Sequence, residues 1–281
     1  MSQSAESTAP PHGEGQSQER LGIAGSGTIA CGLAACAASA GVPVTVWARS
    51  GGSRERLHEE IAKEGIDSVT VTLDPTDLAG ATILVEAVVE DEYVKHDVIR
   101  ALAAAATGDA LLASTTSSLN ITALSASSGM PGRFFGLHVF NPVTKMKLVE
   151  LCYPPEAEPA VRTRAAAFCE TLGKIAVEVP DEPGFVVNRL LFPYLFDAVR
   201  LLERTGLAPG QIDSCMKLGA SYPMGPLELL DFVGLDVADA IGEALFADTG
   251  EASHRPPGRV KQLVGEGKLG KKAGAGFYEY G

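Results

Sequence analysis

Short apolar runs alternate with longer helical segments along the first two thirds of the chain. The runs are rich in Val, Ile, Leu and Phe, which is typical of strands that are buried on both faces of a parallel sheet. Seven such strands are predicted, at Leu21–Ala24, Val44–Trp47, Val69–Leu73, Ile83–Ala87, Leu111–Ser114, Phe134–His138 and Ile175–Val179. The segments between them predict helices, including Ile29–Ala40, Arg54–Lys63 and Val94–Ala106. This regular alternation indicates an α/β fold with a doubly wound parallel sheet.

The pattern changes around Pro180 and Pro183, which with Gly184 indicate a linker. Beyond the linker, helical patterns replace strands, and the first predicted helix, Phe185–Arg204, is long, apolar and kinked at Pro193. Further helices are predicted at Pro209–Leu218, Leu227–Val233, Asp236–Leu245 and Arg259–Glu266. We therefore expect a Rossmann domain over residues 20–180 and an all-helical substrate and dimerisation domain over residues 184–281. Residues 1–19 are mostly Ser, Gln, Pro, Gly and Glu, which predicts a disordered tail.

Composition narrows the functional classes. The 281 residues are 46% hydrophobic and 21% charged, as in ordinary globular proteins, and the net charge of −12 works against nucleic-acid binding. Residues 21–40 carry no charge and therefore resemble a membrane span or a signal peptide. Four glycines interrupt this stretch, however, so we predict a buried strand, a turn and a helix instead. No membrane partner is expected. The five scattered cysteines lack metal-ligand spacing, which predicts free thiols in the cytoplasm and no metal site.

A glycine-rich loop follows the first predicted strand and opens the first helix, which is the context that a dinucleotide-binding site requires. Its sequence is Gly25-Ser26-Gly27-Thr28-Ile29-Ala30. Gly25 permits the sharp turn, and Gly27 lets the backbone approach a pyrophosphate at the positive end of the following helix. Thr28 and Ile29 of this loop are also expected to contact the cofactor. A glycine turn that serves only packing is the simpler alternative, but strand, loop, helix and second strand in this order favour the nucleotide site.

The end of the second strand predicts which nicotinamide cofactor is bound. An Asp or Glu there normally binds the adenosine ribose of NAD, whereas this chain has Ala48-Arg49-Ser50. Arg49 and Ser50 are suited to hold the 2′-phosphate of NADP through charge-assisted hydrogen bonds. NADP is therefore predicted in preference to NAD, the alternative being an exposed arginine without a ligand.

Candidate catalytic residues follow the later strands. Ser114–Leu119 follows the fifth strand, Gly136–Pro142 follows the sixth, and Lys147–Glu150 comes soon after. The carboxyl ends of such strands meet at one edge of an open α/β sheet. Hydride transfer at a secondary alcohol needs a base for the hydroxyl proton and donors for the developing oxyanion. The Ser, His, Asn and Glu side chains in these segments supply both kinds of group.

These segments resemble the 3-hydroxyacyl-CoA dehydrogenase family, and the resemblance extends from about residue 20 to residue 280. It covers the glycine loop, the Ser117-Ser118 turn and the His138 and Glu150 segments. It continues through Gly184-Phe185-Val186-Val187-Asn188-Arg189-Leu190, Tyr222-Pro223-Met224-Gly225-Pro226 and Gly274-Ala275-Gly276-Phe277-Tyr278. So many matches in the same order make coincidence a poor explanation.

The resemblance implies reversible hydride transfer at C3 of a 3-hydroxyacyl thioester in a homodimeric enzyme. It implies that His138 is the general base in alcohol oxidation and that Glu150 orients its ring. Ser117 and Asn188 would bind the substrate oxygen, and three further residues would contact substrate or cofactor, namely Glu90, Lys95 and Asn141. Each has a simpler explanation alone: a structural histidine, a surface glutamate, a helix-capping asparagine. Together, at the family's spacing, they favour catalysis.

Two departures from the family leave the substrate carrier open. Thr115 replaces a usual Asn, and only 20 residues separate Arg49 from Thr70, where typical members insert a long helical hairpin that helps to hold coenzyme A. An acyl carrier protein is therefore an alternative carrier, as in relatives thought to oxidise glyceryl groups for polyketide extender units, although the acidic net charge opposes its docking. Oxidation of a free 3-hydroxy acid and nucleotide binding without catalysis are the remaining alternatives.

Overall fold

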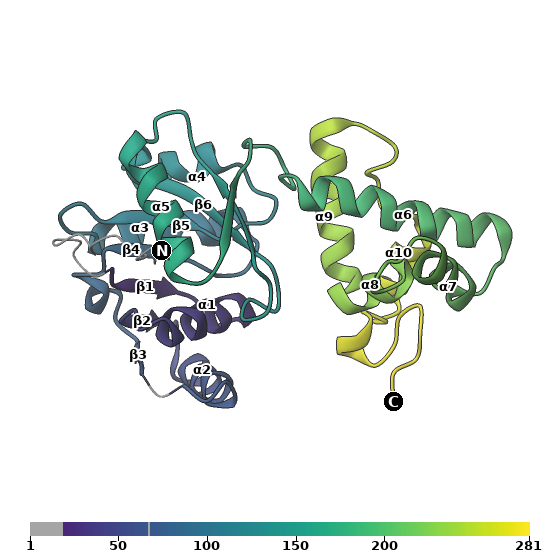
Figure 1. Cartoon of the computed structure of the whole chain (residues 1–281), viewed down its shortest axis with the longest axis horizontal. Coiled ribbons are helices and arrows are strands. Elements are labelled where there is room, and N and C mark those ends of the chain that lie inside the picture. Colours follow the sequence, from purple (N-terminus) through teal and green to yellow (C-terminus); the bar gives the residue numbers. More distant parts are fainter. Residues whose placement is uncertain (1–18, 67) are drawn as a thin grey trace, which may run out of the picture.

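The computed structural model describes residues 19–66 and 68–281 of the chain. Figure 1 shows a sheet-containing domain on the left and a helical domain on the right, joined by one extended linker. Residues 1–18 of the predicted disordered tail lie outside the described residues. Glu19, the last residue of that predicted tail, is ordered instead, because its carboxylate forms a salt bridge with Arg164 at 2.6 Å.

The sheet has eight strands in the order β3-β2-β1-β4-β5-β6-β7-β8. The strands are β1 (Leu21–Ala24), β2 (Val44–Trp47), β3 (Val69–Thr72), β4 (Ile83–Glu86), β5 (Leu111–Ser114), β6 (Phe134–Val139), β7 (Leu148–Cys152) and β8 (Ile175–Glu178). All seven predicted strands are present. Strand β7 was not predicted, and it runs antiparallel to β6. Strand β8 is parallel to β7, so the last two strands of the sheet run opposite to the other six.

Helices cover both faces of the sheet, because side chains alternate between the faces along each strand. Ile83 and Val85 of β4 lie in the core beneath α1, α2 and α5, whereas Leu84 lies in the core beneath α3 and α4. These helices are α1 (Thr28–Ser39), α2 (Gly51–Lys63), α3 (Glu92–Ala105), α4 (Ile121–Ser128) and α5 (Pro159–Thr171). The domain is thus the predicted doubly wound layer structure, and α4 and α5 were not predicted.

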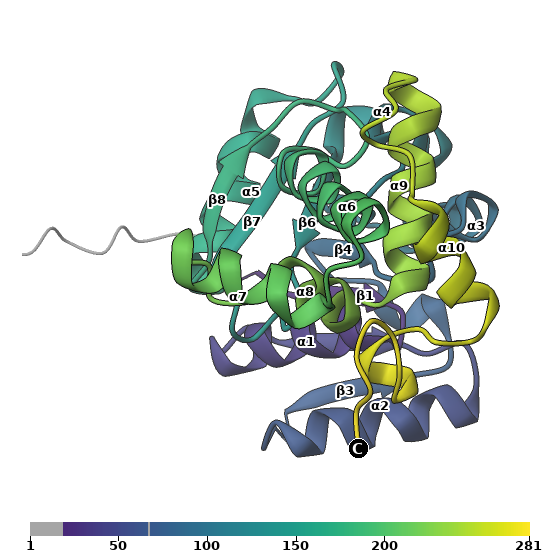
Figure 2. The same ribbon diagram turned by 90° about the vertical axis from the view of Figure 1, so that its right-hand side faces the viewer.

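Five helices form the second domain around a core of their own. They are α6 (Val187–Thr205), α7 (Pro209–Gly219), α8 (Pro226–Val233), α9 (Leu235–Thr249) and α10 (Gly258–Gly265). Figure 2 views this domain from its far side, with the sheet behind it. No helix among residues 19–66 and 68–281 has the length and apolar character that a bilayer crossing requires.

Buried hydrogen bonds explain the C-terminal part of the family resemblance. Asp231 is buried and accepts the N–H groups of Phe277 and Tyr278, both at 2.9 Å. A Cβ atom at Gly276 would lie 2.0 Å from the Asp231 carboxylate, so only glycine fits there. The segment Gly274–Tyr278 therefore packs the chain end onto α8 by a structural contact.

Candidate active site

The glycine loop has the geometry of a pyrophosphate site. Gly25 has a φ of +144°, and a Cβ there would lie 2.1 Å from the carbonyl oxygen of Ala87, so the turn requires glycine. Gly27 precedes the first residue of α1, and a Cβ there would meet no atom within 4 Å, so packing does not require glycine at this position. The first turn of α1 has no acidic residue. An anion can therefore approach the positive end of this helix closely.

A cavity of about 710 Å³ opens beside this loop. It is lined by the loop residues Gly25, Ser26, Gly27, Thr28 and Ile29, by Trp47, Arg49, Ser53 and Arg56 from the region of β2 and α2, and by residues that follow β4. Five predicted cofactor residues thus share one cavity: Gly25, Gly27, Thr28, Ile29 and Arg49. These residues fit a dinucleotide, with the pyrophosphate at α1 and the adenosine end toward β2.

Ser50 does not line this cavity, although it was predicted to bind the cofactor. It is the N-cap of α2, where its hydroxyl oxygen accepts the Ser53 N–H at 3.2 Å. The Ser50 hydroxyl also lies 3.1 Å from the Ser53 hydroxyl. Its hydrogen-bonding capacity is therefore used within the helix start.

Glu90 holds the serine loop that follows β5. One of its carboxylate oxygens accepts the backbone N–H groups of Ser117 and Ser118, at 2.8 and 3.0 Å, and the Thr116 hydroxyl at 2.6 Å. The Ser117 hydroxyl lies 3.3 Å from the same oxygen. Burial opposes the charge of Glu90, but the Lys95 ammonium and these donors lower its pKa below the ordinary value. An ionised Glu90 thus fixes the position of Ser117.

Lys95 is buried and supports the serine loop through its ion pair with Glu90. Its side chain is 1% exposed, and its ammonium lies 2.8 Å from Glu86 and 3.2 Å from Glu90. The second oxygen of Glu86 accepts the Ser114 hydroxyl at 2.6 Å. Sequence reasoning gave no role to Glu86, although a carboxylate that ends an apolar strand, nine residues before a lysine, was a usable signal.

His138 and Glu150 form a buried pair across two neighbouring strands. The antiparallel register of β6 and β7 places them opposite each other, and the His138 Nδ1 atom lies 2.7 Å from a Glu150 oxygen. The residues are 5% and 1% exposed. The imidazole packs against the rings of Phe140 and Phe185, with centroid distances of 4.6 and 5.2 Å. Because Glu150 is bonded to Nδ1, Nε2 is the ring nitrogen that is left to exchange a proton with a ligand.

The second oxygen of Glu150 holds the start of the helical domain. It accepts the N–H groups of Val186 and Val187, at 3.1 and 2.9 Å, where α6 begins. The preceding Phe185 is buried in the core of the sheet domain and has a left-handed φ of +47°. This turn directs both N–H groups at Glu150. Asn188 is the next residue of α6, directly after the Val187 N–H that Glu150 accepts.

The strand order brings most predicted site residues to one edge of the sheet. Strands β1, β4, β5 and β6 are consecutive neighbours, and their carboxyl ends carry the glycine loop, Glu90, Ser117 and His138. Three neighbour spacings of about 4.8 Å separate the glycine loop from His138, roughly 14 Å in all.

Asn141 is exposed in the loop after β6 and does not line the cavity. In residues 19–66 and 68–281, no cluster of His, Cys, Asp and Glu is arranged to hold a metal.

Two family profiles together cover these two domains. The NAD-binding domain of 3-hydroxyacyl-CoA dehydrogenase matches residues 20–182, and the C-terminal domain of the same family matches residues 184–280. The chain belongs to the 3-hydroxyacyl-CoA dehydrogenase family. It is thus a member of a family of NAD-binding oxidoreductases, as the sequence resemblance implied.

Relatives in this family match along most of the chain. A 3-hydroxybutyryl-CoA dehydrogenase of Mycobacterium tuberculosis is 38% identical over 93% of this chain and 98% of its own length. The mitochondrial hydroxyacyl-coenzyme A dehydrogenase of Sus scrofa is 43% identical over 79% of this chain and 71% of its own. The crystal structure of M. tuberculosis FadB2 superposes with a TM-score of 0.90 at 37% identity, covering 95% of this chain and all of that one.

Proposed function

We propose that this protein catalyses reversible hydride transfer between a nicotinamide dinucleotide and C3 of a 3-hydroxyacyl-CoA. The single observation that carries this proposal is the buried His138–Glu150 pair, at the sheet edge that also carries the nucleotide loop. The relatives' names support the substrate class, because they include 3-hydroxybutyryl-CoA dehydrogenases.

The residues divide the proton chemistry between them. When bound, the nicotinamide supplies the hydride acceptor or donor. Glu150 accepts a hydrogen bond from the Nδ1–H group of His138, which leaves Nε2 as the base that takes the hydroxyl proton during oxidation. In reduction, the protonated His138 returns this proton to the carbonyl oxygen. Ser117 and Asn188 are the proposed donors to this oxygen, and Glu90 and Lys95 keep Ser117 in place.

A steady-state comparison of substrates tests this function. We expect kcat/KM for 3-hydroxybutyryl-CoA to exceed that for free 3-hydroxybutyrate by about 10-fold or more, because contacts with the coenzyme A carrier stabilise the transition state. Turnover of the free acid alone would assign the chain to free hydroxy acids. Absence of hydride transfer with every thioester would leave a nucleotide-binding protein without this chemistry.

The same assay decides the thioester carrier. A single 13-residue helix, α2, occupies the chain between β2 and β3, in agreement with the prediction that a long hairpin does not fit there. We propose coenzyme A as the carrier on the basis of the family. A higher kcat/KM with the acyl group on an acyl carrier protein, as in glyceryl oxidation for polyketide extender units, would replace coenzyme A and leave the dehydrogenase reaction unchanged.

We further propose that NADP is preferred to NAD. The acid that binds the adenosine ribose is absent, and Arg49 lines the cofactor cavity at the end of β2. Arg49→Asp should shift the ratio of kcat/KM values for the two cofactors toward NAD by about 100-fold, because the new carboxylate repels the 2′-phosphate and accepts from a free ribose diol. Steady-state kinetics with both cofactors measure this ratio, and an unchanged ratio would remove Arg49 from phosphate recognition.

A homodimer is the assembly that we propose, with the helical domain as its interface. Large apolar side chains are exposed there, notably Leu190 on α6 at 72% and Leu218 on α7 at 86%. Sedimentation at the mass of one chain at micromolar concentration would contradict this proposal.

A cytoplasmic location is also proposed, and it is supported by all five cysteines being free thiols.

A further inference from the structure

Two arginines line the adenosine end of the cofactor cavity without a carboxylate partner. Arg49 follows β2 and Arg56 lies on α2. Within residues 19–66 and 68–281, neither guanidinium lies within 4.0 Å of a carboxylate, although other arginines form such pairs. In a chain with a net charge of −12, two unpaired arginines facing one cavity indicate an anionic ligand.

A hydrogen-bond chain holds Arg56 at this position. The Arg56 guanidinium donates to the Ser53 hydroxyl oxygen at 3.1 Å. Ser53 is buried and bonded in turn to Ser50, the N-cap of α2. These bonds fix the Arg56 guanidinium to the first turn of α2. Ser50 caps α2 and is bonded to Ser53, so it helps to hold Ser53, and through Ser53 also Arg56, in place.

We propose that Arg56 is a specificity-determining residue that binds the 2′-phosphate of NADP together with Arg49. The proposal rests on the preference for NADP argued above. Two guanidinium groups match a phosphate dianion, because each can donate two hydrogen bonds to its oxygens. NADH has an uncharged 2′-hydroxyl at this position, so neither guanidinium can form an ion pair with it. Arg56 should thus strengthen NADPH binding and leave NADH binding unaffected.

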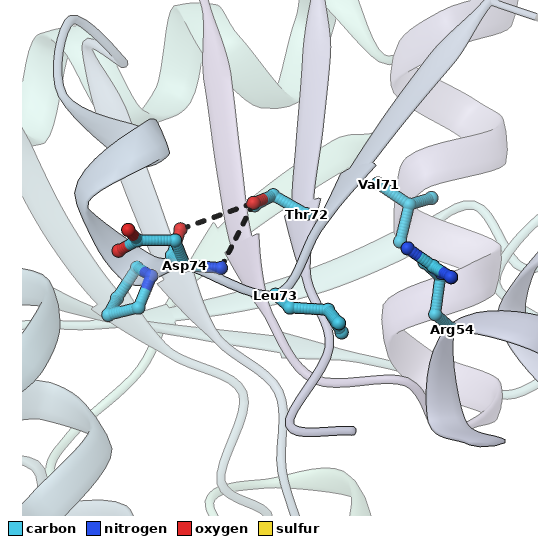
Figure 3. A pocket seen from close by; sticks show the side chains of 6 residues that line it. Arg54, Val71, Thr72, Leu73 and Asp74 are labelled. Carbon is cyan, nitrogen blue, oxygen red and sulfur yellow. Dashed lines mark hydrogen bonds between the residues drawn. The ribbon is translucent and has the colours of Figure 1, made fainter. Parts of the chain in front are cut away.

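Arg54 on the same helix provides a matched control. Figure 3 shows Arg54 beside Val71, at a separate hollow of about 530 Å³ that Thr72, Leu73 and Asp74 also line. The cofactor cavity does not include Arg54. Arg54→Ala removes one positive charge from α2 two residues from Arg56, so it reports the effect of charge alone.

Direct binding measurements test the assignment. Trp47 is the only tryptophan of the chain and lines the cavity, so quenching of its fluorescence reports bound nucleotide, and calorimetry checks the Kd. We expect Arg56→Ala to weaken NADPH binding by about 10-fold or more and NADH binding by less than about 2-fold, as loss of charge-assisted hydrogen bonds implies. Arg54→Ala should change either Kd by less than about 2-fold. The unchanged Kd for NADH also shows that the Arg56 variant is folded.

The possible outcomes separate the two proposals. Tighter binding of NADH than of NADPH by the unmodified protein would overturn the NADP preference, and the Arg56 assignment with it. A preference for NADPH that Arg49→Ala abolishes and Arg56→Ala leaves intact would overturn only the role of Arg56. Equal effects of Arg54→Ala and Arg56→Ala would also overturn it, because general charge would then explain both. A larger loss in Arg56→Ala, confined to NADPH, supports the proposal.

Discussion

Replacing His138 with alanine should lower kcat by about 100-fold or more, the usual contribution of a positioned acid or base. The expected loss follows from the position of the ring, which Glu150 and two aromatic side chains hold in one orientation. The loss should affect oxidation and reduction alike, because the same nitrogen takes the proton in one direction and returns it in the other. Steady-state kinetics with 3-hydroxybutyryl-CoA and acetoacetyl-CoA measure both.

Nucleotide binding provides the control for this variant. His138 does not line the cofactor cavity, so the Kd from Trp47 fluorescence should stay within about 2-fold of its original value. Since His138 is buried, alanine leaves a void, and His138→Gln serves as a second variant that retains more of the side-chain volume. Near-normal turnover in both variants would remove His138 from acid-base catalysis.

The main sheet and the nucleotide loop were predictable because their signals are local. A parallel strand covered on both faces is largely apolar, so Leu111–Ser114 and its counterparts stand out in the sequence. Gly25 stands out for a similar reason, since its conformation and the nearby Ala87 carbonyl admit no side chain. In both cases the residue type follows from its immediate surroundings.

Strand β7 lacked such a signal. Its residues Leu148–Cys152 include Glu150 in the middle and follow Lys145 and Lys147, so they form no continuous apolar run. A carboxylate is tolerated inside this strand only because the imidazole and two N–H groups surround it in the folded chain. The residue that obscured the strand is therefore the one that makes it part of the site.

The link between the catalytic pair and α6 was also beyond sequence reasoning. His138, Glu150 and Asn188 were each proposed through the family resemblance, but their mutual positions depend on the linker. Asp181 in this linker accepts the N–H groups at the start of α4, and Phe185 is buried in the sheet domain. Contacts between segments so far apart leave no periodic pattern in the chain.

Replacing Glu150 with glutamine should lower kcat by about 1000-fold by imposing the wrong tautomer on His138. One Glu150 oxygen faces two N–H donors, from Val186 and Val187, so the amide oxygen of glutamine must take that side. The amide NH₂ group then faces His138 Nδ1 and donates to it. The histidine proton moves to Nε2, which can no longer accept the hydroxyl proton of the substrate. Nitrogen-15 NMR of the imidazole distinguishes the two tautomers.

Glu150→Ala separates this catalytic effect from a structural one. Alanine leaves the Val186 and Val187 N–H groups without their acceptor, which should lower the free energy of unfolding by about 1–3 kcal/mol, whereas glutamine still accepts both. Chemical denaturation should therefore show a clear stability loss for alanine and a small one for glutamine, although both lose turnover. A glutamine variant that kept the Nδ1–H tautomer and near-normal kcat would contradict the proposed role of Glu150, because its charge would then be dispensable.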